Sequence, residues 1–368
     1  MAYLLFIAVC FLAFSNGAND NFKGVATLYG SGIVDFKKAI TWSTITTLSG
    51  SIASLFLAGK LIKNFSGKGL VTADVLTEPP FVLSLALGAA LTVLLATKLS
   101  MPISTTHALI GALSGAGIMS IGMSFNFEKL LEAFFLPMVL SPLLAIILAF
   151  FGYQLLKLFD KNAKINTDCL CLKSNEILNA SQFTSAELML NKEKTLLLQP
   201  CKTSLNEKEN TIMCLEKNKM LNFFHFLSSG LVCFARGLND TPKIVGIMLI
   251  LPIVNHQIGL LIIGIVMAVG GILKSKKVGV TMSKKITSMS SKQGLLSNLT
   301  TSSCVIIAST FGLPVSTTHV SVGSIFGIGI GEGKTNYNMV GKIVMSWVIT
   351  LPVAFTFATI IYVFLKLI

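Results

Sequence analysis

The sequence predicts an all-α polytopic membrane protein with two inverted-topology repeats, whose broken or re-entrant helices meet near the bilayer midplane. Of its 368 residues, 53% are hydrophobic and only 12% are charged, whereas a soluble domain carries about 25% charged residues. The apolar residues fall in long runs, and a helix needs roughly 17–25 of them to cross a bilayer. Two polar motifs also recur in the same order in each half of the chain.

The apolar runs give the transmembrane helices in order. The first half has four such runs, at residues 3–14, 40–58, 81–97 and 134–156. The second half has four more, at residues 244–254, 258–273, 295–313 and 343–367. The first run lacks a positively charged start and a small-residue cleavage site, so we expect mature structure rather than a signal peptide.

A polar segment separates the halves. The expected divisions are residues 1–157 for the first transmembrane repeat, 158–221 for a hydrophilic linker and 222–368 for the second repeat. The linker mixes Lys, Glu, Asn and Ser without a sustained period, so we expect it to be partly helical and partly disordered. Its cysteines include Cys169 and Cys171, whose spacing does not suit a zinc pair and indicates free thiols.

The halves repeat each other in detail. Both contain Gly-x-Asn-Asp-x-x-Lys, from Gly17 to Lys23 and from Gly237 to Lys243. Both then contain Pro-x-Ser-Thr-Thr-His, at residues 102–107 and 314–319, and both close with an apolar run that holds a proline. We expect five crossings per half: a broken span at the Asn-Asp motif, which includes the first apolar run, then two plain helices, a broken span at the Pro-x-Ser-Thr-Thr-His motif and a closing helix. An odd number inverts the second half relative to the first.

The distribution of lysines sets the expected orientation. The net charge of +13 comes almost entirely from lysines between apolar runs, which is typical of positive cytoplasmic loops rather than of nucleic-acid binding. If the linker is cytoplasmic, the lysines at residues 274–292 are inside, and the equivalent loop at residues 60–78, with a balance of only +1, is outside. Both termini are then external.

The Asn-Asp pairs indicate a cation site. Asp20 and Asp240 are the only acidic residues within the predicted spans, where a carboxylate costs about 2.5–3.5 kcal/mol or more unless paired or hydrated. Helix capping alone is the simpler explanation, but the equivalent positions favour an ion site. Asn19 and Asn239 add neutral oxygen ligands, which suit Na⁺ better than a transition metal.

Lys23 and Lys243 lie three residues after the aspartates and can neutralise them or contact an anion. Arg236, the only arginine, has no counterpart in the first repeat, where Asn16 stands, and receives no role.

The second motif indicates an oxyanion site. With a proline at the first helical position, its hydroxyls and free N–H groups would gather at a helix start and bind phosphate or a similar anion. Hydrogen bonding of the hydroxyls to their own helix is the ordinary alternative, but two equivalent copies favour an anion. The predicted phosphate ligands are Ser104, Thr105, Thr106, Ser316, Thr317 and Thr318. His107 and His319 are accessory candidates, either packed in the bundle or relaying protons.

These paired motifs resemble the inorganic phosphate transporter (PiT) family of sodium- or proton-coupled symporters, over both hydrophobic halves but not the linker. The resemblance implies phosphate import down an ion gradient, a multi-pass protein of the cell membrane with a cytoplasmic central loop, and a homodimer. Many members continue the first motif as Asp-Val-Ala-Asn, where this chain has Asn21-Phe22-Lys23 after the aspartate. That departure leaves the coupling ion open between Na⁺, which we favour, and H⁺. No other cofactor is expected, and the partners are phosphate, the cation and membrane lipid.

Other functions remain as alternatives. The nearest is a proton-coupled sulfate or metal–phosphate permease, and a passive channel is also conceivable. An intramembrane hydrolase using Ser104 with His107, or Ser316 with His319, is the remote alternative, since duplicated nucleophiles without an oxyanion loop are unusual in an enzyme. The chain is therefore expected not to be an enzyme. It also lacks a Gly-x-x-x-x-Gly-Lys-[Ser/Thr] nucleotide motif.

Overall fold

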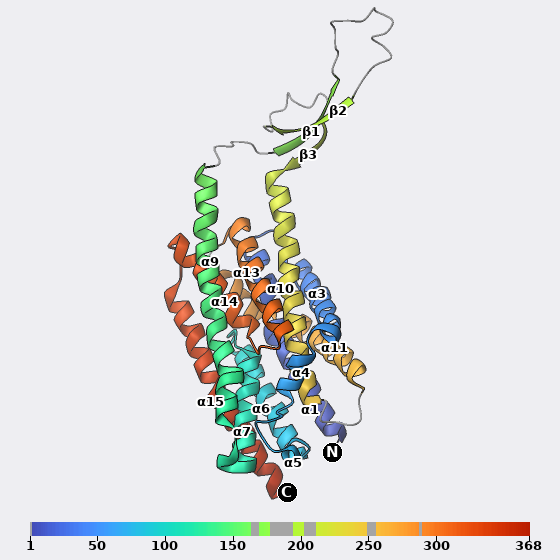
Figure 1. Ribbon diagram of the computed structural model, residues 1–368, viewed down its shortest axis with the longest axis vertical. Helices are drawn as coiled ribbons and strands as arrows, with labels where there is room; N and C mark the ends of the chain where they lie inside the picture. The colour runs from blue at the N-terminus through green and yellow to red at the C-terminus, as the bar shows by residue number, and fades with distance from the viewer. Residues whose placement is uncertain (1, 163–168, 177–193, 202–210, 249–254, 287–288) are drawn as a thin grey trace, which may run out of the picture. The chain divides into compact units, whose positions relative to one another are not determined.

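The computed structural model describes residues 2–162, 169–176, 194–201, 211–248, 255–286 and 289–368. They belong to two compact units: Met1–Leu155 with His225–Ile368, and Leu156–Phe224. The first unit contains the helices of both halves, and both the start of its first helix and the end of its last lie at the same end of that unit (Figure 1).

The helices of the two halves follow the same order. The first half contains α1 (Ala2–Asp20), α2 (Ala26–Gly30), α3 (Phe36–Leu57), α4 (Gly59–Phe65), α5 (Ala73–Leu76), α6 (Pro79–Lys98), α7 (Thr105–Ile121), α8 (Phe127–Leu130) and α9 (Leu136–Asn162). The second contains α10 (Lys217–Met248), α11 (His256–Lys274), α12 (Lys276–Lys284), α13 (Ser291–Phe311), α14 (Thr317–Glu332) and α15 (Tyr337–Leu367). By their motifs, α1, α3, α6, α7 and α9 correspond to α10, α11, α13, α14 and α15.

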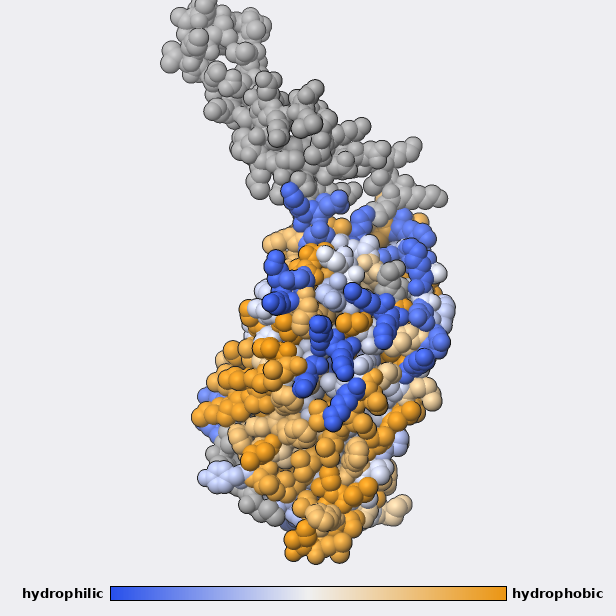
Figure 2. Space-filling view, turned by 180° about the vertical axis from the view of Figure 1, so that it is seen from behind, coloured by the Kyte–Doolittle hydropathy of each residue, from blue (hydrophilic) through white to orange (hydrophobic). Residues whose placement is uncertain are grey.

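Many of these helices are suited to a membrane. Within the described residues, eight helical segments are long and apolar enough to cross a bilayer by length and composition. Large apolar side chains are exposed on several of them, including Leu143, Ile147 and Phe151 of α9. On the face in Figure 2, apolar residues cover a broad area and hydrophilic ones gather toward one end. These features agree with the predicted helical membrane architecture. The run expected at residues 244–254 lies partly outside the described residues.

Glycines let the two halves interlock. A Cβ at Gly17 of α1 would collide with the Met267 carbonyl of α11, and one at Gly237 of α10 would collide with the Thr47 carbonyl of α3. Each Asn-Asp helix therefore packs closely against a helix of the other half, because only a glycine permits this backbone approach.

Close packing between the halves also occurs in the helices that follow the Pro-x-Ser-Thr-Thr-His motifs. A Cβ at Gly111 of α7 would meet the Leu351 carbonyl of α15, and one at Gly323 of α14 would meet the Pro142 carbonyl of α9. The glycines at these two positions therefore also let helices of opposite halves approach closely.

Both Pro-x-Ser-Thr-Thr-His motifs begin a helix, but not at the proline. Ser104 and Ser316 are the N-cap residues, and their hydroxyls accept from the backbone N–H groups of His107 and His319. Pro102 and the equivalent proline therefore lie in the preceding non-helical segments, so the expected first helical position is wrong. Serine satisfies a free N–H at the cap, which proline cannot do.

The Asn-Asp motifs differ from each other. Helix α1 ends at Asp20 and is followed by a turn, a short 3₁₀ segment (Lys23–Val25) and α2, so the first span is broken as expected. Helix α10 instead continues through Asp240 and Pro242, so the expected break in the second copy is wrong. A proline removes one backbone hydrogen bond, whereas a break inside a membrane would leave several groups to be satisfied.

The second unit contains strands that were not expected. Within the described residues of the linker, helix occurs at the two ends, where α9 and α10 extend into it. Strand β1 (Cys169–Glu176) pairs antiparallel with both β2 (Lys194–Cys201) and β3 (Thr211–Glu216). The leucines at 170 and 172 alternate with cysteines, a local period of two that the average composition of the linker conceals. Residues 163–168, 177–193 and 202–210 of the predicted linker lie outside the described residues.

Candidate functional site

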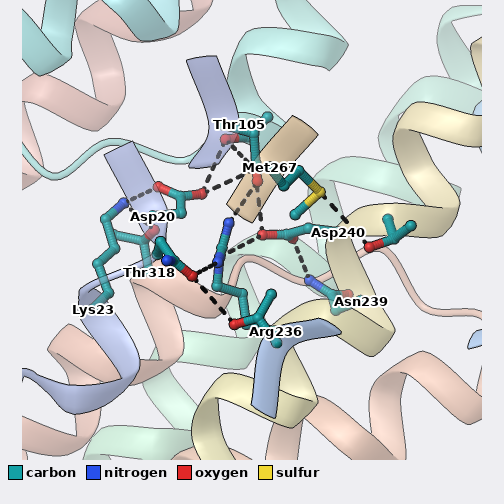
Figure 3. A network of polar contacts seen from close by, with 12 residues as sticks. Asp20, Lys23, Thr105, Arg236, Asn239, Asp240, Met267 and Thr318 are labelled. Carbon is teal, nitrogen blue, oxygen red and sulfur yellow. Dashed lines mark hydrogen bonds and ion pairs between the residues drawn. The ribbon is translucent and has the colours of Figure 1, made fainter. Parts of the chain in front are cut away.

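The two aspartates meet at one side chain. The Asn16 amide nitrogen lies 3.2 Å from Asp20 Oδ2 and 3.4 Å from Asp240 Oδ2. Figure 3 shows the two aspartates within one network of polar contacts. It also donates to Thr105 Oγ1 at 2.9 Å, and that hydroxyl donates to Asp20 Oδ2 at 3.0 Å. The structure therefore brings the equivalent carboxylates of the two halves into one buried cluster.

Lys23 joins this cluster to the other half. Its ammonium pairs with Asp20 Oδ1 and donates to the Ile103 carbonyl and to Thr318 Oγ1, both at 2.7 Å. Thr318 Oγ1 itself donates to the Ile103 carbonyl at 2.9 Å. A lysine of the first half thus holds together the two polar segments that precede or begin α7 and α14.

Lys243 makes the reciprocal set of contacts. Its ammonium lies 2.6 Å from the Val315 carbonyl, 2.8 Å from Thr106 Oγ1 and 3.5 Å from Asp240 Oδ1. Thr106 Oγ1 lies 3.3 Å from the Val315 carbonyl. The ion pair with Asp240 is the looser contact, so this ammonium is held mainly by neutral oxygens.

Arg236 is the central residue that the sequence did not assign. Its guanidinium donates to Asn16 Oδ1 at 2.7 Å and to Asn21 Oδ1 at 3.0 Å, and Nε lies 3.6 Å from Asp240 Oδ2. The side chain is buried. The sequence feature that could have indicated this role is the position of Arg236, four residues before Asp240, which places both side chains on one face of a helix.

Asn19 and Asn239 anchor the non-helical segments. Asn19 donates to Thr97 Oγ1 at 3.0 Å and to the Met101 carbonyl at 3.1 Å, and its oxygen accepts from the Ile103 N–H at 3.3 Å. Asn239 donates to the Val315 carbonyl at 3.2 Å and to Asp240 Oδ1 at 3.0 Å.

The oxygen of Asn239 accepts from Ser309 at 3.2 Å. In this arrangement both amide oxygens already serve a protein donor, so the asparagines hold the segments that carry Ile103 and Val315.

The two Ser-Thr-Thr segments lie side by side at helix starts. In the described part of the chain, no acceptor is found for the backbone N–H groups of Thr105, Thr106, Thr317 and Thr318. All four residues are buried. Free N–H groups at a helix start, together with the helix dipole, favour a bound anion, and here two such starts converge.

The histidines lie behind these segments. The rings of His107 and His319 are 4.4 Å apart between centroids, and His319 stacks on Trp347 at 3.8 Å. The Trp347 indole donates to the Pro102 carbonyl at 3.1 Å. The histidines pack against each other across the halves and do not reach the aspartates through any hydrogen bond among the described residues.

The charges of the cluster favour a negative ligand. Two carboxylates, Asp20 and Asp240, face three cationic side chains, Lys23, Arg236 and Lys243. With all five ionised, the formal charge is +1, and all five are buried. Buried charges are costly unless paired, so an anion that contributes negative charge would stabilise this cluster.

The donor atoms present suit a hard cation rather than a transition metal. The described residues contain no group of three or more His, Cys, Asp or Glu side chains that could hold a metal ion. The oxygen atoms around the aspartates instead belong to carboxylate, carbonyl and hydroxyl groups, and these are the donors that hard cations prefer.

Comparisons with known proteins agree with this arrangement. Residues 16–358 match a family model described as the phosphate transporter family. A relative from Pyrococcus furiosus, named as a phosphate permease, is 26% identical over 390 residues, which cover 95% of this chain and 93% of the relative. Inorganic phosphate transporter 2-1, chloroplastic, from Arabidopsis thaliana is 25% identical and matches 98% of this chain and 71% of its own length.

A solved structure has a similar fold. It is described as the sodium-dependent phosphate transporter, and it superposes with a TM-score of 0.75 at 23% identity, covering 100% of this chain and 99% of that one. The likeness confirms the predicted fold class of a helical, polytopic membrane protein.

Proposed function

Because this chain belongs to the phosphate transporter family, whose model matches residues 16–358, we propose that it imports inorganic phosphate together with a cation, with Na⁺ favoured. The family consists of transporters, so the chain is a multi-pass membrane protein and not an enzyme. The proposal concerns the substrate, the coupling ion and the way in which the two halves move.

One observation carries the proposal. The starts of α7 and α14, one from each half, converge on a buried cluster of formal charge +1, and their first backbone N–H groups have no acceptor among the described residues. Phosphate carries between one and two negative charges at neutral pH and offers four oxygens to such donors. Ser104 and Ser316 cap the helices, while Thr105, Thr106, Thr317 and Thr318 supply the N–H groups and hydroxyls nearest to the anion.

Na⁺ supplies the charge that makes phosphate movement favourable. The solved structure of similar fold is described as sodium-dependent, and the aspartates of this chain are surrounded by oxygen donors that suit the ion. If two Na⁺ accompany one monovalent phosphate, one net positive charge enters per cycle. That movement gains about 2.3 kcal/mol per 100 mV of membrane potential.

Alternating access explains how a buried site exchanges its cargo. Asp20, Asp240, Thr105 and Thr317 are all buried, so the halves must separate on one side and then on the other. Hydrogen bonds between the halves lie at the site itself, from Lys23 to Thr318 and from Lys243 to Thr106. We propose that the halves rock about this centre as inverted repeats.

The remaining features of the proposal concern placement. The protein would lie in the cell membrane with its linker in the cytoplasm and both termini outside, as the lysine distribution predicts. A homodimer is proposed from the family resemblance.

Uptake of labelled phosphate into proteoliposomes tests the function directly. We expect accumulation above the external concentration when Na⁺ is high outside, and none when K⁺ replaces Na⁺. Uptake driven equally by a proton gradient would instead support the proton-coupled alternative, and stronger competition by sulfate than by unlabelled phosphate would support a sulfate permease. Equilibration without accumulation would indicate a channel.

A further inference from the structure

Each lysine ammonium of the cluster lies in a seat of three oxygens. The first seat consists of Asp20 Oδ1, the Ile103 carbonyl and Thr318 Oγ1, and holds Lys23. Each oxygen is of a different kind: carboxylate, backbone carbonyl and hydroxyl. The set draws on both halves of the chain, because Thr318 belongs to the second half.

The second seat has the same composition as the first, with the roles of the two halves exchanged. It consists of Asp240 Oδ1, the Val315 carbonyl and Thr106 Oγ1, and holds Lys243. The same three kinds of oxygen occur, and again the hydroxyl comes from the other half. Hard cations prefer such oxygen sets, so the three oxygens around each ammonium group are of the kinds that bind Na⁺.

A free cation cannot reach the first aspartate without moving the lysine. Asp20 Oδ1 faces Lys23, while Oδ2 accepts from Asn16 and from Thr105. Both carboxylate oxygens are therefore engaged by protein donors. The cluster also already carries a formal charge of +1, so adding Na⁺ beside a seated ammonium would place like charges together in a buried site.

We propose that Na⁺ and the lysine ammonium groups exchange in these two seats. When Na⁺ takes the carboxylate, carbonyl and hydroxyl, the lysine is released beside the start of the opposite helix, where Thr318 or Thr106 lies. The released ammonium then pairs with phosphate. Sodium binding thereby creates a cationic partner for the anion, which couples the two ligands. This inference rests on the proposed function and names the cation sites within it.

The ion pair between ammonium and carboxylate is closer in the first seat than in the second. Lys243 Nζ lies 3.5 Å from Asp240 Oδ1, whereas Lys23 and Asp20 are in close contact. The weaker ion pair is the easier one for Na⁺ to replace. We therefore expect the second seat to exchange first, and the first seat to exchange once the cluster has loosened.

Binding of radioactive sodium to the purified full-length chain tests the exchange without measuring transport. In Lys243→Gln the competitor is gone, so sodium should bind more tightly and depend less on added phosphate. If the lysine leaves its seat about one tenth of the time, removing it should strengthen sodium binding about tenfold. Lys63→Gln, at an exposed residue of α4, is the matched control and should bind sodium as the unaltered chain does.

Unchanged or weaker sodium binding by a folded Lys243→Gln protein would overturn the exchange. In that variant Arg236 is the one remaining cationic partner of Asp240 among the described residues. The double variant Asp240→Asn with Lys243→Gln guards against misfolding, because it replaces the ion pair with neutral amides. We expect it to bind one sodium ion fewer per chain than the control, and an unchanged number would equally overturn the second seat.

Failure of this inference is distinguishable from failure of the proposed function. If the unaltered chain accumulates phosphate with Na⁺ but the variants bind sodium normally, the symport stands and the exchange is wrong. If the unaltered chain binds sodium with the expected variant effects but accumulates no phosphate, the seats stand and the transported anion is wrong.

Discussion

The Arg236 guanidinium donates to the Asn16 side-chain oxygen at 2.7 Å, although the two residues occupy the same position of the two repeats. Each lies four residues before an aspartate. Equivalent residues can touch only where the halves meet on a shared centre, so this contact marks the middle of the site. It also makes the centre asymmetric, because one half supplies a cation where the other supplies an amide.

Arg236→Gln should weaken phosphate binding and lower stability. It removes the cation that brings the cluster to +1, and among the described residues it leaves Asp240 with one ion pair, the long contact to Lys243. Breaking a buried pair costs about 3–5 kcal/mol, so we expect a large rise in the apparent phosphate constant and a lower unfolding temperature. Uptake kinetics and thermal unfolding measure the two effects, and unchanged values in both would contradict a central role.

Asp20→Asn and Asp240→Asn should both reduce the dependence of uptake on Na⁺, but with different effects on folding. Asp20 is in close contact with Lys23, so its loss strands a buried ammonium and should destabilise the protein more. The ion pairs of Asp240 are longer, at 3.5 Å to Lys243 and 3.6 Å to Arg236. Sodium titrations of uptake and thermal unfolding of the purified variants test this order. Normal sodium activation in both variants would refute the cation assignment.

Thr317→Val offers a cleaner test of the anion site than Thr105→Val. Among the described residues, Thr317 makes no side-chain hydrogen bond, whereas Thr105 also donates to Asp20. A hydrogen bond to a charged group contributes about 1.5–3 kcal/mol, so each variant should raise the apparent phosphate constant roughly tenfold or more. Only Thr105→Val should also alter sodium activation. Equal phosphate affinity in Thr317→Val and the unaltered chain would argue against contact with the anion.

Gly237→Ala should impair assembly of the two halves. The added Cβ would collide with the Thr47 carbonyl, which cannot move as a flexible side chain could. Overpacking typically costs 1–3 kcal/mol, which should appear as a lower unfolding temperature. Gly341→Ala is the control, because nothing lies within 4 Å of its added Cβ, and it should leave stability unchanged or slightly higher.

Cysteine labelling tests the inversion of the repeats. Lys63 of α4 and Lys285, which follows α12, lie in equivalent loops and are exposed. In a chain whose native cysteines are replaced by serine, Lys63→Cys should react with an impermeant thiol reagent from outside intact cells. Lys285→Cys should react only after permeabilisation. Labelling of both from the same side would rule out inverted topology.

The sequence by itself determined the membrane class, the duplication and the residues most closely tied to the site. Asp20 and Asp240 stood out because an unpaired carboxylate is costly in an apolar run, and the repeated Ser-Thr-Thr segments stood out because a helix start exposes N–H groups. These are local properties of composition and spacing, so they can be read without coordinates. The departure of the first motif at Lys23 was equally visible.

Only the tertiary structure decided which groups meet. Lys23 contacts Thr318, and Lys243 contacts Thr106, because the two halves interlock. The contact of Arg236 with Asn16 and the continuity of α10 through Asp240 depend on the same interlocking. Spacing within one helix cannot reveal them, because the partners are separated by up to 295 residues in the chain. Their proximity is set by close packing of helices from opposite halves, which forces buried polar groups to find partners there.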